Sequence, residues 1–124
     1  MTKRILIIED QEDNRTILRD LLSTAGYALI EAVDGHEGVK LARSERPDLI
    51  LMDIQLPGLD GYEATRQIRA TEELKSVPII AVTSYALSGD EVKAREAGCD
   101  GYVTKPFSPR QLLAKVREYL QAGD

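Results

Sequence analysis

The sequence has no tryptophan, one cysteine and one histidine in 124 residues. With Cys99 as its only cysteine the chain cannot form an internal disulfide, and a zinc site would lack the thiolates that structural zinc sites use. His36 stands alone in the segment GHEG, and we interpret it as a solvent-exposed side chain. Cys99 is interpreted as a small buried hydrophobic residue. Neither residue type supports zinc or disulfide chemistry.

Positive charge is also scarce, because 16 Lys and Arg residues face 21 Asp and Glu residues and give a net charge of -5. Nucleic acid and anionic membranes both require a basic footprint, so we expect neither as a direct partner. No apolar stretch is long enough to span a bilayer, and the start MTKRILIIED has no signal-peptide cleavage pattern. We therefore expect a cytoplasmic protein with one domain over residues 1–124, a length that suits a single core.

Short apolar runs alternate with segments of helical periodicity. The runs predict strands at Arg4–Glu9, Tyr27–Ala32, Asp48–Asp53, Pro78–Thr83 and Gly101–Thr104. Four of them are nearly all apolar, which is typical of strands buried on both faces, whereas the second contains Glu31 and suits an edge. The segments between them predict helices at Gln11–Ala25, Gly35–Glu45, Gly61–Ala70, Ser88–Ala97 and Pro109–Gln121. This alternation predicts an α/β fold, a flavodoxin-like doubly wound (βα)5 arrangement with a five-stranded parallel sheet in the order 2-1-3-4-5.

Polar side chains follow four of these strands at their carboxyl ends. Glu9 and Asp10 follow the first strand, Asp53 ends the third, Thr83 ends the fourth and Lys105 follows the fifth. Parallel strands bring these ends to one edge of the sheet, and ligands bind there at the switch point between the first and third strands. We therefore expect the three carboxylates to cluster, with Thr83 and Lys105 beside them.

A cluster of three carboxylates is unfavourable without a cation. Oxygen ligands without nearby His or Cys favour Mg²⁺, for which Mn²⁺ is expected to substitute. A carboxylate nucleophile, a metal ion and the donors Thr83 and Lys105 are the groups that phosphoryl transfer requires. Asp53 lies between the acid pair and these donors, so we predict that it accepts the phosphoryl group. Taken singly, each of these residues is equally consistent with an ordinary turn or cap residue.

Four motifs in order make the chain resemble the response-regulator receiver domain family, the CheY-like fold, over essentially its whole length. The motifs are ILIIED, LILMDIQLPGLDGYE, AVTSYA and GYVTKPF. The resemblance implies a single-domain response regulator of a two-component phosphorelay. Such a protein is a signalling switch, not a conventional enzyme, and catalyses only its own phosphorylation and dephosphorylation.

The resemblance also implies roles for the residues around Asp53. Asp53 accepts the phosphoryl group from a phosphohistidine on a histidine kinase or a histidine phosphotransfer protein. Asp10 and Asp53 bind Mg²⁺ through their carboxylates, Glu9 helps through water, and the main-chain carbonyl of Gln55 completes the protein ligands. Glu9 stands where many family members carry Asp. Gln55 and Tyr85 border the phosphate and are expected to tune its lifetime.

The same resemblance implies a route from the phosphate to a partner. Lys105 contacts the phosphoryl group, and the peptide bond between Lys105 and Pro106 is expected to be cis. Thr83 moves toward the phosphate, and Tyr102 swings inward into the vacated space. The surface that then changes for a downstream protein target consists of the helix Ser88–Ala97, the fifth strand and the last helix.

Two questions stay open from the sequence. The last helix is basic on its exposed side and the region before the fifth strand is acidic, which fits either two solvated faces or a homodimer through complementary charges. The start Met-Thr-Lys directly before the first strand favours a complete protein over a receiver cut from a hybrid kinase. A flavodoxin-like electron carrier would share the fold, but its phosphate would be repelled by the acidic loop EDQEDN.

Overall fold

The structure is a computed structural model that describes residues 2–84 and 90–122. The strands are β1 (Arg4–Ile8), β2 (Ala28–Ala32), β3 (Leu49–Asp53), β4 (Ile79–Thr83) and β5 (Gly101–Thr104). The helices are α1 (Glu12–Thr24), α2 (Gly35–Glu45), α3 (Gly61–Arg69), α4 (Asp90–Ala97) and α5 (Pro109–Ala122). All neighbouring strands are parallel, and their order is β2-β1-β3-β4-β5. The predicted flavodoxin-like fold and strand order are therefore confirmed.

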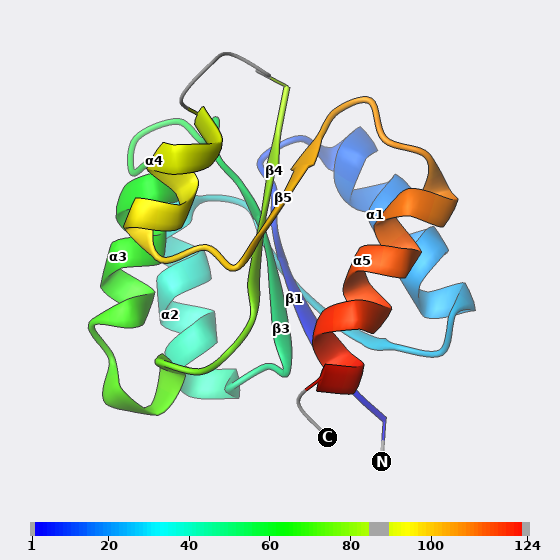
Figure 1. Ribbon diagram of the computed structural model, residues 1–124, viewed down its shortest axis with the longest axis horizontal. Coiled ribbons are helices and arrows are strands. Elements are labelled where there is room, and N and C mark those ends of the chain that lie inside the picture. The colour runs from blue at the N-terminus through cyan, green and yellow to red at the C-terminus, as the bar shows by residue number, and fades with distance from the viewer. Residues whose placement is uncertain (1, 85–89, 123–124) are drawn as a thin grey trace.

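The helices cover both faces of the sheet, with α1 and α5 on one side and α2, α3 and α4 on the other (Figure 1). Alternate residues of the central strands face the two sides, because side chains of a strand point alternately to opposite faces. Ile5, Ile7, Leu49 and Leu51 pack with Leu18, Leu22, Leu112 and Val116, while Leu6, Ile8, Ile50 and Met52 pack with Val39, Ala42, Ala64 and Ile68. Burial on both faces explains the nearly continuous apolar runs of these strands.

Several helices begin at side-chain caps. Asp34 and Asp60 accept hydrogen bonds from the backbone N–H groups three residues later, at 2.8 and 2.9 Å, and Ser108 accepts one from the backbone of Gln111 at 3.0 Å. Such caps pair N–H groups that have no partner within the helix. Ser88, at which the sequence predicts that the fourth helix begins, lies outside the described residues.

The amino ends of β4 and β5 are joined by Arg69, at the end of α3. Its guanidinium donates to the carbonyl oxygens of Gly98, Leu74 and Val77 at 2.9, 2.9 and 2.7 Å. It also pairs with the carboxylate of Asp100 at 2.7 Å, and the same Asp100 oxygen accepts from the backbone N–H of Ile79 at 2.9 Å. We call these groups the Arg69 cluster.

Two local features differ from the sequence-based expectation. Ile17 stands at helical spacing with Leu18, Leu21 and Leu22 in the sequence, which suggests the core face, but it is 58% exposed, because α1 buries the stripe that contains Leu18 and Leu22. A 3-10 helix at Glu72–Leu74 was not predicted, since three residues are too few to show a period. His36 is exposed and Cys99 is buried, as expected. Among the residues described, no helix has both the length and the apolar character needed to cross a membrane.

Candidate functional site

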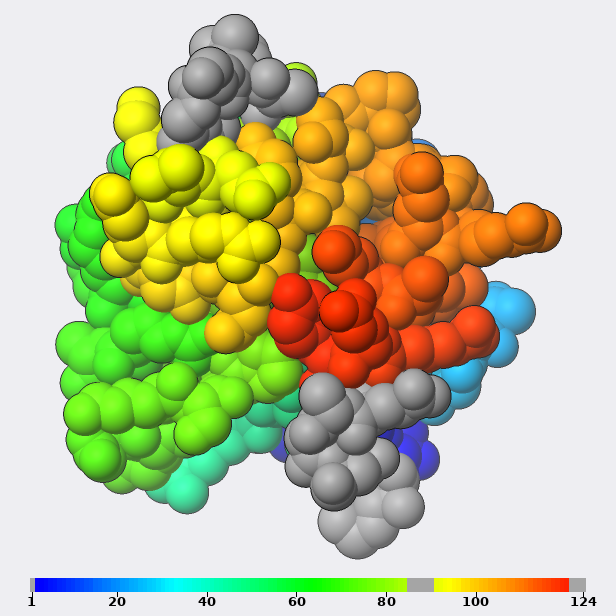
Figure 2. Space-filling model, in the orientation of Figure 1, coloured from blue at the N-terminus to red at the C-terminus, as the bar shows by residue number. Residues whose placement is uncertain are grey.

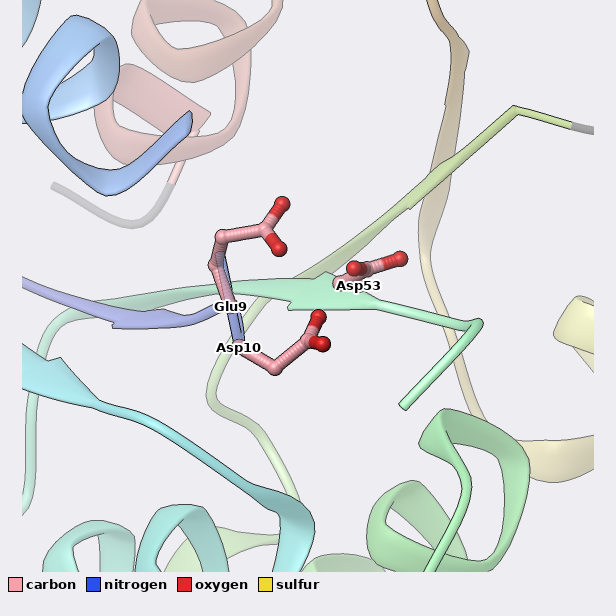
Figure 3. Close-up of side chains that lie close together, drawn as sticks. All are labelled: Glu9, Asp10 and Asp53. Atoms are coloured by element: carbon pink, nitrogen blue, oxygen red, sulfur yellow. The ribbon is translucent and has the colours of Figure 1, made fainter. Parts of the chain in front are cut away.

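The register of the sheet brings the three predicted carboxylates together. Ile8 of β1 lies opposite Met52 of β3, so the residues that follow them, Glu9 and Asp53, are neighbours at the carboxyl edge of the sheet. Glu9, Asp10 and Asp53 each offer an oxygen within 4.8 Å of the others, and Figure 3 shows the three carboxylates gathered at the ends of β1 and β3. We call this group the acid cluster.

Burial and mutual repulsion shift the pKa values within the acid cluster. Burial, followed by the charge of Glu9, raises the pKa of Asp53 to about 6, although Lys105 opposes the shift. Burial and the neighbouring Glu9 also raise the pKa of Asp10. Burial acts in the same direction on Glu9, but hydrogen bonds from Lys105 and the Gln11 backbone outweigh it and lower the pKa of Glu9. The cluster therefore favours the binding of positive charge, whether a proton or a metal ion.

The donor set of the acid cluster fits a hard divalent cation. Its ligand atoms are carboxylate oxygens, and Glu9 and Asp53 are only 2% and 5% exposed. Mg²⁺ prefers a few carboxylate oxygens together with water or phosphate oxygens. These three residues are therefore able to hold such an ion.

Lys105 lies between two of the carboxylates. Its Nζ is 2.8 Å from a carboxylate oxygen of Glu9 and 3.7 Å from Oδ2 of Asp53. The sequence placed Lys105 beside Asp53, but it did not predict the shorter ion pair with Glu9, a residue 96 positions away. The peptide bond between Lys105 and Pro106 is cis, as predicted.

Thr83 ends β4 and is 2% exposed. The side-chain Nε2 of Gln55 donates to Thr83 Oγ1 at 2.7 Å, and the Oε1 of Gln55 accepts from the backbone N–H of Ser84 at 3.1 Å. The backbone N–H of Gln55 donates to Asp53 Oδ1 at 3.0 Å. Sequence reasoning gave Gln55 a role through its main-chain carbonyl, so these side-chain hydrogen bonds are an addition.

Tyr102 and Tyr85 were the remaining predicted residues near the site. Tyr102, in β5, is half-buried and packs against the core on the side of α2, α3 and α4. Its inward movement stays a prediction. Tyr85 lies outside the described residues.

Arg15 is a residue of the site that sequence reasoning missed. Its guanidinium donates to the carbonyl oxygens of Glu9 and Asp10 at 3.0 and 3.1 Å, and its Nε lies 3.6 Å from Glu31 of β2. Arg15 thus fixes the loop between β1 and α1 from the side of the edge strand. The feature of the sequence that could have indicated this contact is Glu31, an acid within an otherwise apolar strand.

Two glycines pack the loop between β3 and α3 against its neighbours. A Cβ at Gly61 would lie 2.4 Å from the carbonyl oxygen of Asp53, and one at Gly35 would lie 2.4 Å from the carbonyl oxygen of Leu59. Real Cβ atoms do not approach backbone atoms so closely. The two glycines therefore allow α2 and α3 to begin in contact with the chain that carries Asp53.

A cavity of about 420 Å³ opens next to Lys105. Its apolar lining comes from α1 and the segment after β5 and includes Ile17 and Phe107. Ile17 is exposed there, so this apolar surface adjoins the acid cluster.

Comparison with known proteins places the chain in a family. Residues 5–117 match the family described as the response regulator receiver domain. The polar-differentiation response regulator DivK of Brucella ovis is 45% identical over 120 residues, which cover 97% of this chain and 98% of that protein.

Solved structures agree with this relationship. The receiver domain of sensor histidine kinase PA1611 from Pseudomonas aeruginosa, which holds a magnesium ion in its active site cleft, is 40% identical with a TM-score of 0.91 and covers 98% of this chain and 99% of that one. Chemotaxis protein CheY4 of Vibrio cholerae is 28% identical with a TM-score of 0.92, and the match covers 97% of this chain and 100% of that one. The chain therefore belongs to the response regulator receiver domains of two-component signalling.

Proposed function

We propose that the chain is a single-domain response regulator, with its receiver domain over residues 1–124, in which Asp53 accepts a phosphoryl group. The observation that supports this best is the setting of Asp53, a buried carboxylate between two further acids and Lys105. The donor is a phosphohistidine on a histidine kinase or a histidine phosphotransfer protein. An oxygen of Asp53 forms a bond to phosphorus, and the bond from phosphorus to the imidazole nitrogen breaks with its electron pair passing to that nitrogen.

Mg²⁺ is the proposed cofactor, and Mn²⁺ is expected to substitute. The proposed ligands are the carboxylates of Asp10 and Asp53 and the main-chain carbonyl of Gln55, with Glu9 acting through water. When bound, the ion neutralises negative charge on the carboxylates and on the phosphoryl oxygens. The magnesium ion in the related PA1611 receiver domain and the clustering of the three acids both support this assignment.

Lys105 and Thr83 are proposed to receive the phosphoryl oxygens. The Lys105 amine already lies 3.7 Å from Asp53, so a modest movement brings its charge to an oxygen bonded there. The hydroxyl of Thr83, at the end of the adjacent strand, supplies a neutral donor. Donors fixed before the reaction stabilise the charge of the transferring group without a large rearrangement.

Phosphorylation is proposed to change the surface formed by α4, β5 and α5. Figure 2 views the molecule from the side on which these three elements lie next to one another. Tyr102 lines a cavity of about 600 Å³ there, together with α5 residues that include Gln111 and Lys115. A turn of Thr83 toward the phosphate and an inward movement of Tyr102 would alter this cavity, which a downstream protein target in the cytoplasm would detect.

A homodimer through the same surface is a second candidate. Glu91 and Glu96 are exposed on α4, while Arg110 and Arg117 are exposed on α5, so two copies can present opposite charges to each other. Light scattering with and without a phosphoryl analogue tests this possibility. A mass that remains that of the monomer in both conditions contradicts it.

Exposure to acetyl phosphate followed by intact-mass measurement tests the proposed function. The wild type is expected to form a phospho-adduct that requires Mg²⁺ or Mn²⁺, and Asp53→Asn is expected to form none. Asp20→Asn is the matched control, since Asp20 is an exposed acid on α1 outside the acid cluster. An adduct that persists in Asp53→Asn, or that forms fully in excess chelator, would contradict the assignment.

A further inference from the structure

The side chain of Gln55 links the ends of two neighbouring strands. Gln55 follows β3 by two residues, and its amide bonds to both Thr83 and Ser84 at the end of β4, at 2.7 and 3.1 Å. The first bond uses the amide as a donor and the second uses it as an acceptor, so both ends of one planar group are engaged. Such a two-point contact fixes an orientation more firmly than a single hydrogen bond.

The backbone of Gln55 is also held in place. Its N–H donates to Asp53 at 3.0 Å, and the loop that carries it is packed against Gly35 and Gly61. The side-chain amide therefore extends from a fixed point to Thr83, which is itself buried at 2% exposure. A reorientation of the Thr83 hydroxyl must break or change the bond from Gln55.

We propose that the side chain of Gln55 is a positioning residue that stabilises the unphosphorylated arrangement of Thr83 and Ser84 and so opposes the switch. This inference rests on the proposed phosphorylation of Asp53. The Gln55 amide donates to the oxygen of the Thr83 hydroxyl and accepts from the Ser84 N–H, so a phosphoryl group that draws these two groups toward Asp53 must pull them away from Gln55. Loss of the amide therefore favours the arrangement that binds the phosphoryl group.

A role of the opposite sign for the Gln55 amide would change phosphoryl binding in the other direction. If the Gln55 amide instead held Thr83 in the orientation that a phosphoryl group requires, its removal would weaken phosphoryl binding. The two roles predict changes of opposite sign in the same equilibrium constant.

The size of the effect follows from the two hydrogen bonds. A net hydrogen bond between neutral groups corresponds to roughly a 2- to 10-fold change in an equilibrium constant. Gln55 is half-buried, so water replaces part of what is lost. We expect a gain of roughly 3- to 30-fold in affinity for a phosphoryl analogue when the amide is removed.

Gln55→Met is the main variant, because it removes both hydrogen bonds and nearly keeps the volume. Gln55→Ala removes the amide together with most of the side-chain volume. The same result in both variants would show that the effect does not come from the packing of the Met side chain. Gln67→Met is the matched control, since Gln67 lines the groove between α2 and α3 and lies outside the acid cluster.

The measurement is the Kd for beryllofluoride, an analogue of a carboxyl-bound phosphoryl group, at saturating Mg²⁺, followed by NMR. The Kd for Mg²⁺ alone is measured first in each protein and is expected to change by less than about 2-fold, because the side-chain amide is not a proposed ligand. Both Gln55 variants are expected to bind beryllofluoride more tightly, and Gln67→Met is expected to match the wild type. Unchanged or weaker binding in both Gln55 variants overturns the proposal.

A double-mutant cycle with Thr83→Val shows whether Gln55 acts through Thr83. Val keeps the shape of the buried Thr83 side chain but removes the hydroxyl, so Gln55→Met should give a smaller gain in that background than in the wild type. Equal gains in both backgrounds contradict the positioning role. If the wild type itself fails to bind beryllofluoride with Mg²⁺, the proposed function and this inference both fall, whereas normal wild-type binding with no Gln55 effect removes only the inference.

Discussion

The acid cluster lies at the carboxyl ends of the strands and the Arg69 cluster lies at their amino ends. The two clusters differ in how completely their charges are paired. In the Arg69 cluster a guanidinium is matched by four backbone carbonyls, those of Gly98, Leu74, Val77 and, at 3.3 Å, Lys75, and by the carboxylate of Asp100. In the acid cluster, three carboxylates lie beside one amine, that of Lys105, and burial raises the pKa of Asp53 to about 6. We therefore expect the Arg69 cluster to stabilise the fold, and the acid cluster to favour a cation at a cost in stability when none is bound.

The largest effect should come from breaking the Arg69 cluster. Arg69→Ala leaves several carbonyl oxygens and the Asp100 carboxylate without their partner, so we expect the free energy of unfolding to fall by about 3 kcal/mol. Urea denaturation in the presence of excess chelator measures this change. Arg66→Ala is the control, because its ion pair with Glu63 is exposed and should contribute less than about 0.5 kcal/mol. Equal losses in the two variants would mean that the Arg69 cluster is not a stabilising unit.

Removing the charge of Asp53 from the acid cluster should raise the free energy of unfolding, the opposite of the effect of Arg69→Ala. The folded-state pKa of Asp53, about 6, lies above its ordinary value of 3.8, so ionisation of Asp53 opposes folding above pH 6. In chelator at pH 8, Asp53→Asn should therefore raise the free energy of unfolding by about 1–2 kcal/mol.

The pH dependence sharpens this prediction. As the pH falls through 6, wild-type Asp53 takes up a proton and regains stability, so the advantage of Asp53→Asn should shrink and be lost near pH 4. Urea denaturation of both proteins across this range measures the difference. A stability advantage that is absent at pH 8, or that grows toward low pH, would show that ionised Asp53 is well accommodated.

The smallest predicted effect concerns Arg15, which holds the backbone of the acid cluster. Arg15→Lys keeps the positive charge but loses the planar group that bonds to both Glu9 and Asp10 carbonyls, so Mg²⁺ binding should weaken roughly 3-fold. Calorimetric titration with Mg²⁺ measures this. Arg19→Lys is a matched control, since Arg19 also pairs with Glu31 but does not contact these carbonyls. Equal affinities in all three proteins would restrict Arg15 to a structural role.

Much of the fold was predictable because its determinants are local. Runs such as Leu49–Asp53 are apolar at every position except the last, and α2 and α3 begin at Asp34 and Asp60, whose side chains bind the backbone three positions later. The acid cluster was also predictable, because the parallel order alone brings the ends of β1 and β3 together.

The contacts between distant side chains were not predictable. Lys105 pairs with Glu9 across 96 positions and Gln55 reaches Thr83 across 28, and neither distance leaves a periodic pattern. Ile17 shows a different limit, because its spacing fits the apolar stripe of α1 while its side chain projects beside the stripe. Which side-chain atoms meet depends on rotamers and on the placement of loops, which no spacing in the sequence specifies.

Gly35 and Gly61 have a consequence for how this protein can vary. Because backbone atoms fill the space where their side chains would lie, these two positions exclude every larger amino acid without a shift of the chain. Position 55 lies in the loop that these glycines contact, yet its side chain is half-exposed and its backbone N–H is bonded to Asp53. The backbone around Asp53 is therefore fixed while the side chain at position 55 is free to vary, so we expect a substitution there to change the proposed switch without moving the backbone of the site.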